Sequence, residues 1–281
     1  MQKAALALLC FGLAFCAARG QVTVEVTQPQ DQFLPGEAMP TAVRVKNLSG
    51  QALHLGEAPD WLTFTLEPVD GGVVVQNADV PVVGEFDLPS SKVATKRLDL
   101  APYFSMTKPG RYRIIATVKV KNWDRELKSD PLRFNIIHGA VLWSQEFGLP
   151  TASGLADRPP EVRKYILQQA NYLKGQIRLY VRVTDPSEAR IFRVVNIGVL
   201  RSFSQPEHQI DSSSNLHVLY ASGPQRDGTP GYLYSVFNPD GELITRQSYE
   251  YVDSRPRLKV DADGKITVAG KPVSLTSNAP H

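Results

Sequence analysis

Cysteine is almost absent from this sequence of 281 residues. Its two cysteines, Cys10 and Cys16, both fall in an apolar N-terminal stretch that we expect to be removed. The remaining chain would then have no thiol nucleophile, no disulfide and no thiolate ligand for zinc. Its fold must depend on an ordinary hydrophobic core, and a chain of this length is expected to build two domains.

Long apolar runs are also lacking. The uncharged run Ala4–Ala18 is too short to span a bilayer, and Ala18-Arg19-Gly20 places small residues at the −3 and −1 positions of a cleavage site. We therefore predict a signal peptide over residues 1–20 and a periplasmic or secreted protein. A buried N-terminal helix and a lipid anchor on Cys16 are the alternatives, and the bulk of Phe15 disfavours the anchor. No later run approaches the roughly 20 apolar residues of a membrane helix, so we expect no transmembrane segment in the mature chain.

Clustered charge and paired histidines are missing as well. Without Lys3 and Arg19, 29 basic residues stand against 28 acidic ones, and the basic residues alternate with apolar ones as on the exposed face of a sheet. We therefore expect no nucleic-acid partner. No His-x-His or His-x-x-x-His spacing occurs, so we predict no metal site and no cofactor. The five histidines are His54, His138, His208, His217 and His281.

Short runs that alternate apolar and polar residues dominate the first half of the chain. Examples between residues 21 and 138 are Val22–Val26, Thr41–Lys46 and Tyr112–Val120. About seven such runs at about ten-residue spacing are typical of an antiparallel β-sandwich. We predict an all-β protein whose first domain, residues 21–138, is such a sandwich.

Two parts of this half resemble bacterial immunoglobulin-like domains. Leu98–Phe104 followed by Lys108–Ile114 is similar to their E–F corner and F strand, and Phe33–Glu37 followed by Val43–Asn47 is similar to their A–B region. The resemblance implies an immunoglobulin-like sandwich without the disulfide of antibody domains. Because some proteinase inhibitors share this pattern, it also leaves an inhibitor role open, with the loop from Val80-Pro81 to Pro89 as bait.

The second half contains a predicted linker and a series of hairpins. Residues 139–160 are rich in proline, glycine and small side chains, which indicates a linker, and residues 161–281 are predicted to be a hairpin-rich β domain. Residues 161–173 fit either a helix or a strand, and we favour a strand because hairpins follow. The predicted turns lie at Asp185–Glu188, Asp211–Asn215, Asn238–Gly241 and Asp261–Gly264.

These hairpins resemble the blade hairpins of β-propellers. The half is too short for a closed ring of blades, so we expect a propeller-like β-meander. Its open edges could be covered by the other domain or by a second copy of the chain, which makes a homodimer possible. Asp261, Asp263 and Gly264 also faintly resemble a calcium loop, but Lys265 and Ile266 follow where further oxygen ligands are needed, so we interpret them as a turn.

Tyrosines suggest a binding surface in this second domain. An aromatic and arginine-bearing sheet face suits recognition of a protein or a glycan, although such pairs also simply stabilise sheets. If Asn238 lies opposite Glu242 across the turn, Tyr234 faces Arg246. The candidate binding residues are Tyr232, Tyr234, Arg246, Tyr249 and Tyr251.

Acid–base residues suggest an alternative. The densest group comprises Glu207, His208, Asp211 and His217. A hydrolase could use Glu207, His208 and Asp211, with Ser202 or Ser204 nearby, but no Gly-x-Ser-x-Gly motif is present. We therefore predict no catalytic residue and favour an exported, non-catalytic binding or assembly protein that recognises a protein or glycan in the envelope or exterior. The alternatives are the secreted proteinase inhibitor and the hydrolase.

Overall fold

A computed structural model describes residues 22–121, 123, 126–149, 161–171, 175–224 and 230–273. These residues form β-strands and one short 3₁₀ helix, Ala101–Tyr103, with no α-helix among them. The predicted all-β class is therefore confirmed. The predicted signal peptide and residues 150–160 of the predicted linker lie outside the described residues.

The chain divides into two compact units. The first contains the described residues up to Asp31 together with Met39–Ser105 and Gly110–Asn135. The second contains the rest from Ile136 onward, along with the short segments Gln32–Ala38 and Met106–Pro109. Two pieces of the first half of the sequence thus cluster with the second unit, which the predicted division at residue 138 did not anticipate.

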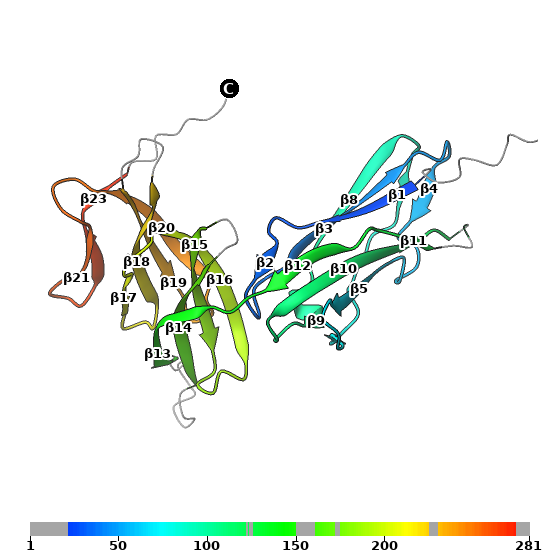
Figure 1. The fold of residues 1–281 in the computed structure, drawn as a ribbon. Coiled ribbons are helices and arrows are strands. Elements are labelled where there is room, and N and C mark those ends of the chain that lie inside the picture. Colours follow the sequence, from blue (N-terminus) through cyan, green and yellow to red (C-terminus); the bar gives the residue numbers. More distant parts are fainter. Residues whose placement is uncertain are drawn as a thin grey trace, which may run out of the picture. The chain divides into compact units, whose positions relative to one another are not determined.

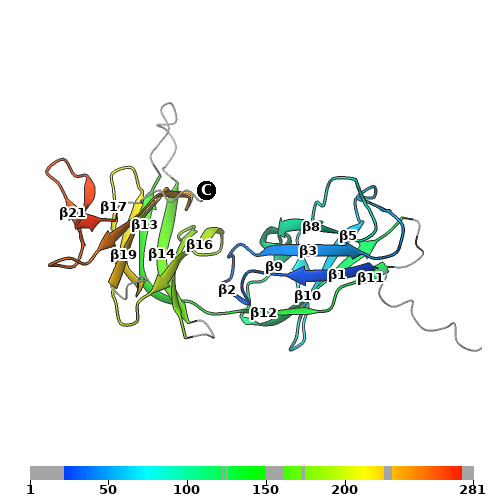
Figure 2. The ribbon, with the colours of Figure 1, turned by 90° about the horizontal axis from the view of Figure 1, so that it is seen from above.

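The first unit is built from antiparallel strands (Figures 1 and 2). Strands β1, β3 and β8 form one antiparallel sheet, and β5, β10, β11 and β12 belong to another. Strands β3 and β10 bury alternate side chains, so each sheet has a core face and a solvent face. The strands are β1 (Val22–Thr27), β3 (Pro40–Asn47), β4 (Leu53–Leu55), β5 (Leu62–Pro68), β6 (Val75–Gln76), β7 (Phe86–Leu88), β8 (Lys92–Asp99), β9 (Phe104–Ser105), β10 (Gly110–Lys119), β11 (Glu126–Lys128) and β12 (Leu132–Ile136).

The second unit is a meander of antiparallel hairpins (Figure 1). Its large sheet follows the order β13-β14-β15-β16-β18-β19-β20-β23, with β17 paired to β18, while β21 and β22 form a separate hairpin. The strands are β13 (Ala140–Gly148), β14 (Val162–Asn171), β15 (Ile177–Thr184), β16 (Ile191–Leu200), β17 (Glu207–Ile210), β18 (Leu216–Pro224), β19 (Pro230–Phe237), β20 (Leu243–Glu250), β21 (Arg257–Val260), β22 (Ile266–Ala269) and β23 (Lys271–Pro272). The remaining two-residue strand, β2 (Gln32–Phe33), lies in the segment Gln32–Ala38.

Local turn chemistry sets the hairpins where the sequence predicts them. At Asn238–Gly241 the Gly241 amide donates to the Asn238 carbonyl (2.8 Å), and Asn238 N donates to Glu242 O (3.0 Å). Gly241 has a φ of +76°, and a Cβ there would lie 3.0 Å from the Val183 side chain. Glycine is therefore needed at this position for both its conformation and its size.

Two further predictions concern the residues that join the halves. The predicted linker is wrong for residues 140–148, because β13 pairs with β14 along its length. Its polar residues mark an edge strand rather than a spacer, since β13 ends the sheet and has a bulge between Val141 and Trp143. The favoured strand is confirmed for residues 162–171, which form β14, while residues 172 and 173 lie outside the described residues. Pairing of a sheet edge with a second copy stays a prediction.

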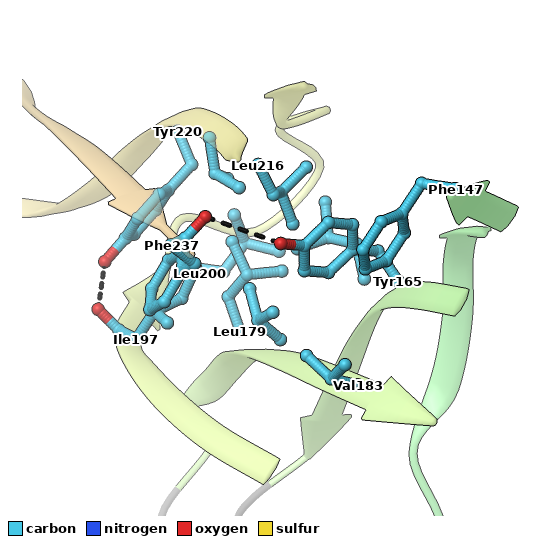
Figure 3. Packing of buried hydrophobic residues seen from close by; sticks show 12 residues of the cluster. Phe147, Tyr165, Leu179, Val183, Ile197, Leu200, Leu216, Tyr220 and Phe237 are labelled. Atoms are coloured by element: carbon cyan, nitrogen blue, oxygen red, sulfur yellow. Dashed lines mark hydrogen bonds between the residues drawn. The ribbon is translucent and has the colours of Figure 1, made fainter. Parts of the chain in front are cut away.

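Aromatic side chains anchor the core of the second unit (Figure 3). Tyr165 stacks on Phe147 with 4.1 Å between ring centroids and donates a hydrogen bond to the Ser214 carbonyl (3.0 Å). Tyr220 donates to the Ile197 carbonyl, and burial raises the pKa of Tyr220 to about 12. Each phenol therefore stays neutral and has a hydrogen-bond partner inside an apolar cluster.

Candidate functional site

The predicted tyrosine surface is largely covered. Tyr232 and Tyr234 are each only 8% exposed and belong to a core cluster on one face of β18 and β19. Leu258 and Val268, from the β21–β22 hairpin, pack against that cluster. The alternation of tyrosines correctly indicates a shared face, but the prediction that this face is open to a partner is wrong for these two residues.

Arg246 lies on the other face of the sheet. Strand pairing places Tyr234 opposite Gln247, and Arg246 opposite Ser235, because the register shifts by one residue between Val236 and Phe237. The turn itself pairs as predicted, so the bulge alone moves the arginine. Its guanidinium donates to the carbonyl of Ile197 (3.1 Å). The predicted Tyr234–Arg246 pair is therefore wrong.

Tyr249 and Tyr251 differ in environment. Tyr249 is half-buried and packs edge-on against Tyr234, with 6.4 Å between ring centroids. Tyr251 lies beyond the end of β20 and is 50% exposed. The five predicted binding residues thus do not form one surface, and a recognition role for Tyr249 or Tyr251 stays a prediction.

The predicted acid–base group is split between two sheet faces. Glu207 accepts hydrogen bonds from Arg255 (2.6 Å) and from the amide of Leu258 (2.8 Å). His208, the next residue on the strand, instead packs against Trp143 with 4.2 Å between ring centroids and a tilt of 36° between the ring planes. Successive side chains of a strand point to opposite faces, so these two cannot converge on one substrate. This arrangement contradicts the convergence of Glu207, His208 and Asp211 that the hydrolase alternative requires.

Asp211 instead joins a buried chain of polar groups that the sequence did not reveal. Its carboxylate lies 3.1 Å from Nε2 of His217, and Nδ1 of His217 lies 2.7 Å from the hydroxyl of Tyr234. Burial raises the pKa of Tyr234 to about 12, so its phenol is a weaker acid than usual and not an activated nucleophile. None of the three residues lines either of the two cavities described next. We interpret the chain as a structural network.

A cavity of about 320 Å³ lies in the second unit, beside a tight turn. It is formed by residues 201–205, by the start of β17, by the middle of β18, by the first part of β19 and by the segment before β21. Its lining includes Phe203, Gln205, Glu207, Tyr232, Arg255 and Pro256. The sequence analysis places Tyr232 in a binding surface and Glu207 in an acid–base group. In the structure both residues line this one cavity.

The turn Arg201–Ser204, here called the Phe203 turn, holds an unusual residue. Phe203 is fully exposed, at 106%, and has a φ of +62°. The Ser204 amide and hydroxyl both donate to the Arg201 carbonyl (3.1 and 2.7 Å), and Arg201 N donates to Ala221 O (2.9 Å). Hydrogen bonds thus lock the turn. Phe203 carried no periodic signal in the sequence, because its exposure and backbone angle depend on the folded turn.

The first unit contains a larger cavity, of about 540 Å³. Residues from β4, from the loop 56–61 and from the end of β10 through the start of β11 line it. No residue of the predicted bait loop is among those that line the cavity, although the loop packs against Gly56 and Trp61. Val80 and Val82 are buried and β7 pairs with β4, which leaves residues 83–85 exposed as a continuous stretch before β7. The exposed part of the bait loop that the inhibitor alternative requires is therefore much shorter than the sequence suggests.

Two features are absent from the part of the chain that the structure describes. No group of three or more histidine, aspartate or glutamate side chains there is arranged to hold a metal ion. In the same part of the chain, no helix is long and apolar enough to cross a membrane. Asp261 accepts from the amides of Asp263 (3.1 Å) and Lys265 (2.8 Å), as expected of a turn.

Comparison with known proteins does not assign a family. No family model matches the chain, and no curated protein matches it. A solved structure that does match is that of Spo0M, a sporulation control protein from Bacillus subtilis, with 12% identity over 63% of this chain and 89% of that one. Its TM-score is 0.33, too low to support any argument. The immunoglobulin-like resemblance of the first unit therefore stays a prediction.

Proposed function

We propose that this is an exported, non-catalytic binding protein that docks a protein partner through the Phe203 turn of its second unit. The observation that carries the proposal is a fully exposed phenylalanine held at a φ of +62°. The predicted signal peptide supports export. The separation of Glu207 and His208 onto opposite sheet faces supports a role without catalysis.

The free chain gains no stability from Phe203 as it stands. A residue with a side chain costs roughly 1–2 kcal/mol in the left-handed conformation that glycine adopts freely. An exposed ring also forgoes roughly 1.5–3 kcal/mol of burial. Both costs are offset if a partner buries the ring, and exposed aromatic residues on rigid loops are typical of the anchors that dominate binding energy.

The neighbouring cavity supplies a polar rim for such an interface. Glu207 is held by Arg255 and by the Leu258 amide, so the position of its carboxylate is set before any partner arrives. The Arg255 side chain is partly exposed and has further N–H donors to offer. An aromatic anchor beside an arginine matches the composition of energetically dominant contacts in protein interfaces.

The shape favours a protein over a glycan at this place. Phe203 projects from a turn, so its partner must supply a socket that encloses the ring. Folded proteins provide apolar sockets, whereas small sugars are themselves the guests of concave sites. The partner class expected for this surface is therefore a protein with an apolar pocket flanked by an acidic group that can meet Arg255.

The test is site-specific photo-crosslinking in the envelope fraction of the native host. The photoreactive amino acid p-benzoylphenylalanine at position 203 should yield one dominant crosslinked protein, identified by mass spectrometry. The matched control places the same group at position 260, where Val260 on β21 is also an exposed apolar residue. With the purified partner, Phe203→Ser should weaken binding at least about tenfold, and Val260→Ser should change it less than about twofold.

Two outcomes would contradict the proposal. The first is the same set of crosslinked proteins from positions 203 and 260, which would indicate nonspecific contact. The second is unchanged affinity of Phe203→Ser for the crosslinked partner, which would show that the ring contributes nothing to the interface.

A further inference from the structure

The larger cavity lies within the first unit and is independent of the Phe203 turn. It is called here the sandwich cleft, and it occupies about 540 Å³. This volume falls within the roughly 300–1,000 Å³ of typical small-molecule sites. Its described lining residues belong to two segments, His54–Trp61 and Lys119–Glu126, both inside the first unit.

Tryptophan residues form the apolar part of the sandwich cleft. Trp61 is 2% exposed, donates from its indole to the Val82 carbonyl (3.0 Å) and meets Phe86 edge-on at 5.8 Å. These contacts fix the Trp61 ring. Trp123 is half-buried, and its amide donates to the Val120 carbonyl (2.9 Å). The sandwich cleft thus contains one rigid ring and one more accessible ring.

A close backbone contact sets one wall of the sandwich cleft. Gly56 has a φ of +92°, and a Cβ on it would lie 2.2 Å from the Gly84 carbonyl oxygen. Only glycine allows the loop 56–61 to lie this near to residue 84. The wall at residue 56 is therefore shaped by main-chain packing.

Paired charges form the polar part of the sandwich cleft. Lys119 lies 2.6 Å from Asp60 and 3.9 Å from Glu126, and Lys121 is paired with Glu57. The hydrogen bond with Lys119 lowers the pKa of Asp60, so this carboxylate is ionised at neutral pH. The cleft therefore offers ammonium donors and carboxylate acceptors side by side.

We propose that the sandwich cleft binds a neutral saccharide unit. Sugar hydroxyls both donate and accept hydrogen bonds, so one ring can donate to Asp60 or Glu57 and accept from Lys119 or Lys121. The less polar face of a sugar ring can pack on an aromatic side chain such as Trp123.

Charged ligands fit this lining less well. An anionic ligand would approach the three carboxylates of Glu57, Asp60 and Glu126, whereas a cationic one would compete with the lysines for them. Either would have to disrupt an existing ion pair, and a neutral polyol need not. This proposal does not rest on the Phe203 turn, because the two sites share no residue.

Fluorine NMR provides a test that separates the sites within one molecule. The chain has three tryptophans: Trp61 and Trp123 line the sandwich cleft, and Trp143 lies in the second unit. All three are labelled with 5-fluorotryptophan, and their signals are assigned with single Trp→Phe variants. The probes are glucose, galactose, N-acetylglucosamine and their disaccharides, with glucuronate, glucosamine and glycylglycine as charged comparisons. We expect a neutral sugar to shift the Trp123 signal with saturation while the Trp143 signal stays in place.

A matched pair of substitutions tests the hydrogen-bonding role. Asp60 and Asp70 are both exposed aspartates of the first unit with a pKa lowered by a cationic partner, Lys119 and Arg111 respectively. Only Asp60 lines the sandwich cleft. Asp60→Asn should weaken sugar binding about tenfold and Asp70→Asn should leave it unchanged. Trp123→Ala should weaken binding by at least as much as Asp60→Asn.

Three results would overturn the proposal. The first is no shift of the Trp123 signal by any of the neutral sugars at tens of millimolar concentration. The second is tighter binding of a charged comparison compound than of every neutral sugar. The third is equal weakening by Asp60→Asn and Asp70→Asn, which would point to a general charge effect rather than contact in the cleft.

Discussion

Nδ1 of His217 lies 2.7 Å from the phenolic oxygen of Tyr234, inside the second unit. Nε2 of the same ring lies 3.1 Å from Asp211, so one buried histidine bridges a turn and a central strand. Asp211 is in turn held by the amides of Ser213 (2.9 Å) and Asn215 (2.8 Å). This network ties the β17–β18 turn to β19, and its members should be energetically coupled.

Tyr234→Phe should lower the free energy of unfolding by about 1–3 kcal/mol, because it leaves a buried nitrogen of His217 without a partner. Urea denaturation measures the change. In a His217→Leu background the same substitution should cost much less, since no partner remains to be orphaned. Equal costs in both backgrounds would show that the hydrogen bond contributes nothing.

His54 should titrate above its usual value. The protonated His54 ring donates hydrogen bonds to the carboxylates of Asp87 (2.7 Å) and Glu85 (2.6 Å), and these bonds, the one to Asp87 first, raise the pKa of His54 above 6.5. Its protonated form is favoured by folding, so this stabilisation is complete below pH 6.5 and is lost as the pH rises through the folded-state pKa. NMR titration of the His54 ring should show the raised pKa, and Asp87→Asn should lower it. The same pKa in both proteins would rule out the carboxylate as its cause.

His208 should behave in the opposite way. Burial lowers the pKa of His208, which packs against Trp143. Its neutral form is favoured by folding, so the stabilisation is present above pH 6.5 and is lost as the pH falls through the folded-state pKa. Unfolding measured between pH 4.5 and 8 should show a smaller acid-induced loss of stability for His208→Phe than for the native chain. Identical pH profiles for His208→Phe and the native chain would show that protonation of His208 does not cause the loss of stability.

Phe203→Gly should raise the free energy of unfolding by up to about 1 kcal/mol, because glycine relieves the left-handed strain and loses only part of that gain to unfolded-chain entropy. Phe203→Ala keeps the strain and should show no such gain. Thermal or urea unfolding of the two variants decides the point. If Phe203→Ala were more stable than Phe203→Gly, the turn would not be strained.

Gly56→Ala should destabilise the first unit by about 3 kcal/mol, since its Cβ would lie 2.2 Å from the Gly84 carbonyl oxygen at a φ of +92°. Gly71→Ala is the matched control, because Gly71 has nearly the same φ, +91°, but no heavy atom within 4 Å of a Cβ. Its cost should reflect the backbone angle alone and be about 1–2 kcal/mol. Equal losses would show that the close approach to residue 84 does not matter.

Local patterns in the sequence determined the all-β class and most of the hairpins. Alternation along Thr41–Lys46 and Tyr112–Val120 reports which side chains face a core, and this information lies in consecutive residues. Turn residues such as Asn238–Gly241 likewise set their own conformation through nearby hydrogen bonds. The strand at 162–171 could be predicted only as the favoured alternative to a helix. A short apolar run is compatible with the side-chain periods of both a helix and a strand.

Only the tertiary structure decided where binding could occur. A bulge of one residue separates Tyr234 from Arg246, and a hairpin distant in sequence covers Tyr232 and Tyr234. The exposure of Phe203 and the sandwich cleft likewise depend on segments that meet after folding. Side-chain alternation shows that two residues share a face, but whether that face is buried is set by what packs on it, and that partner lies elsewhere in the chain.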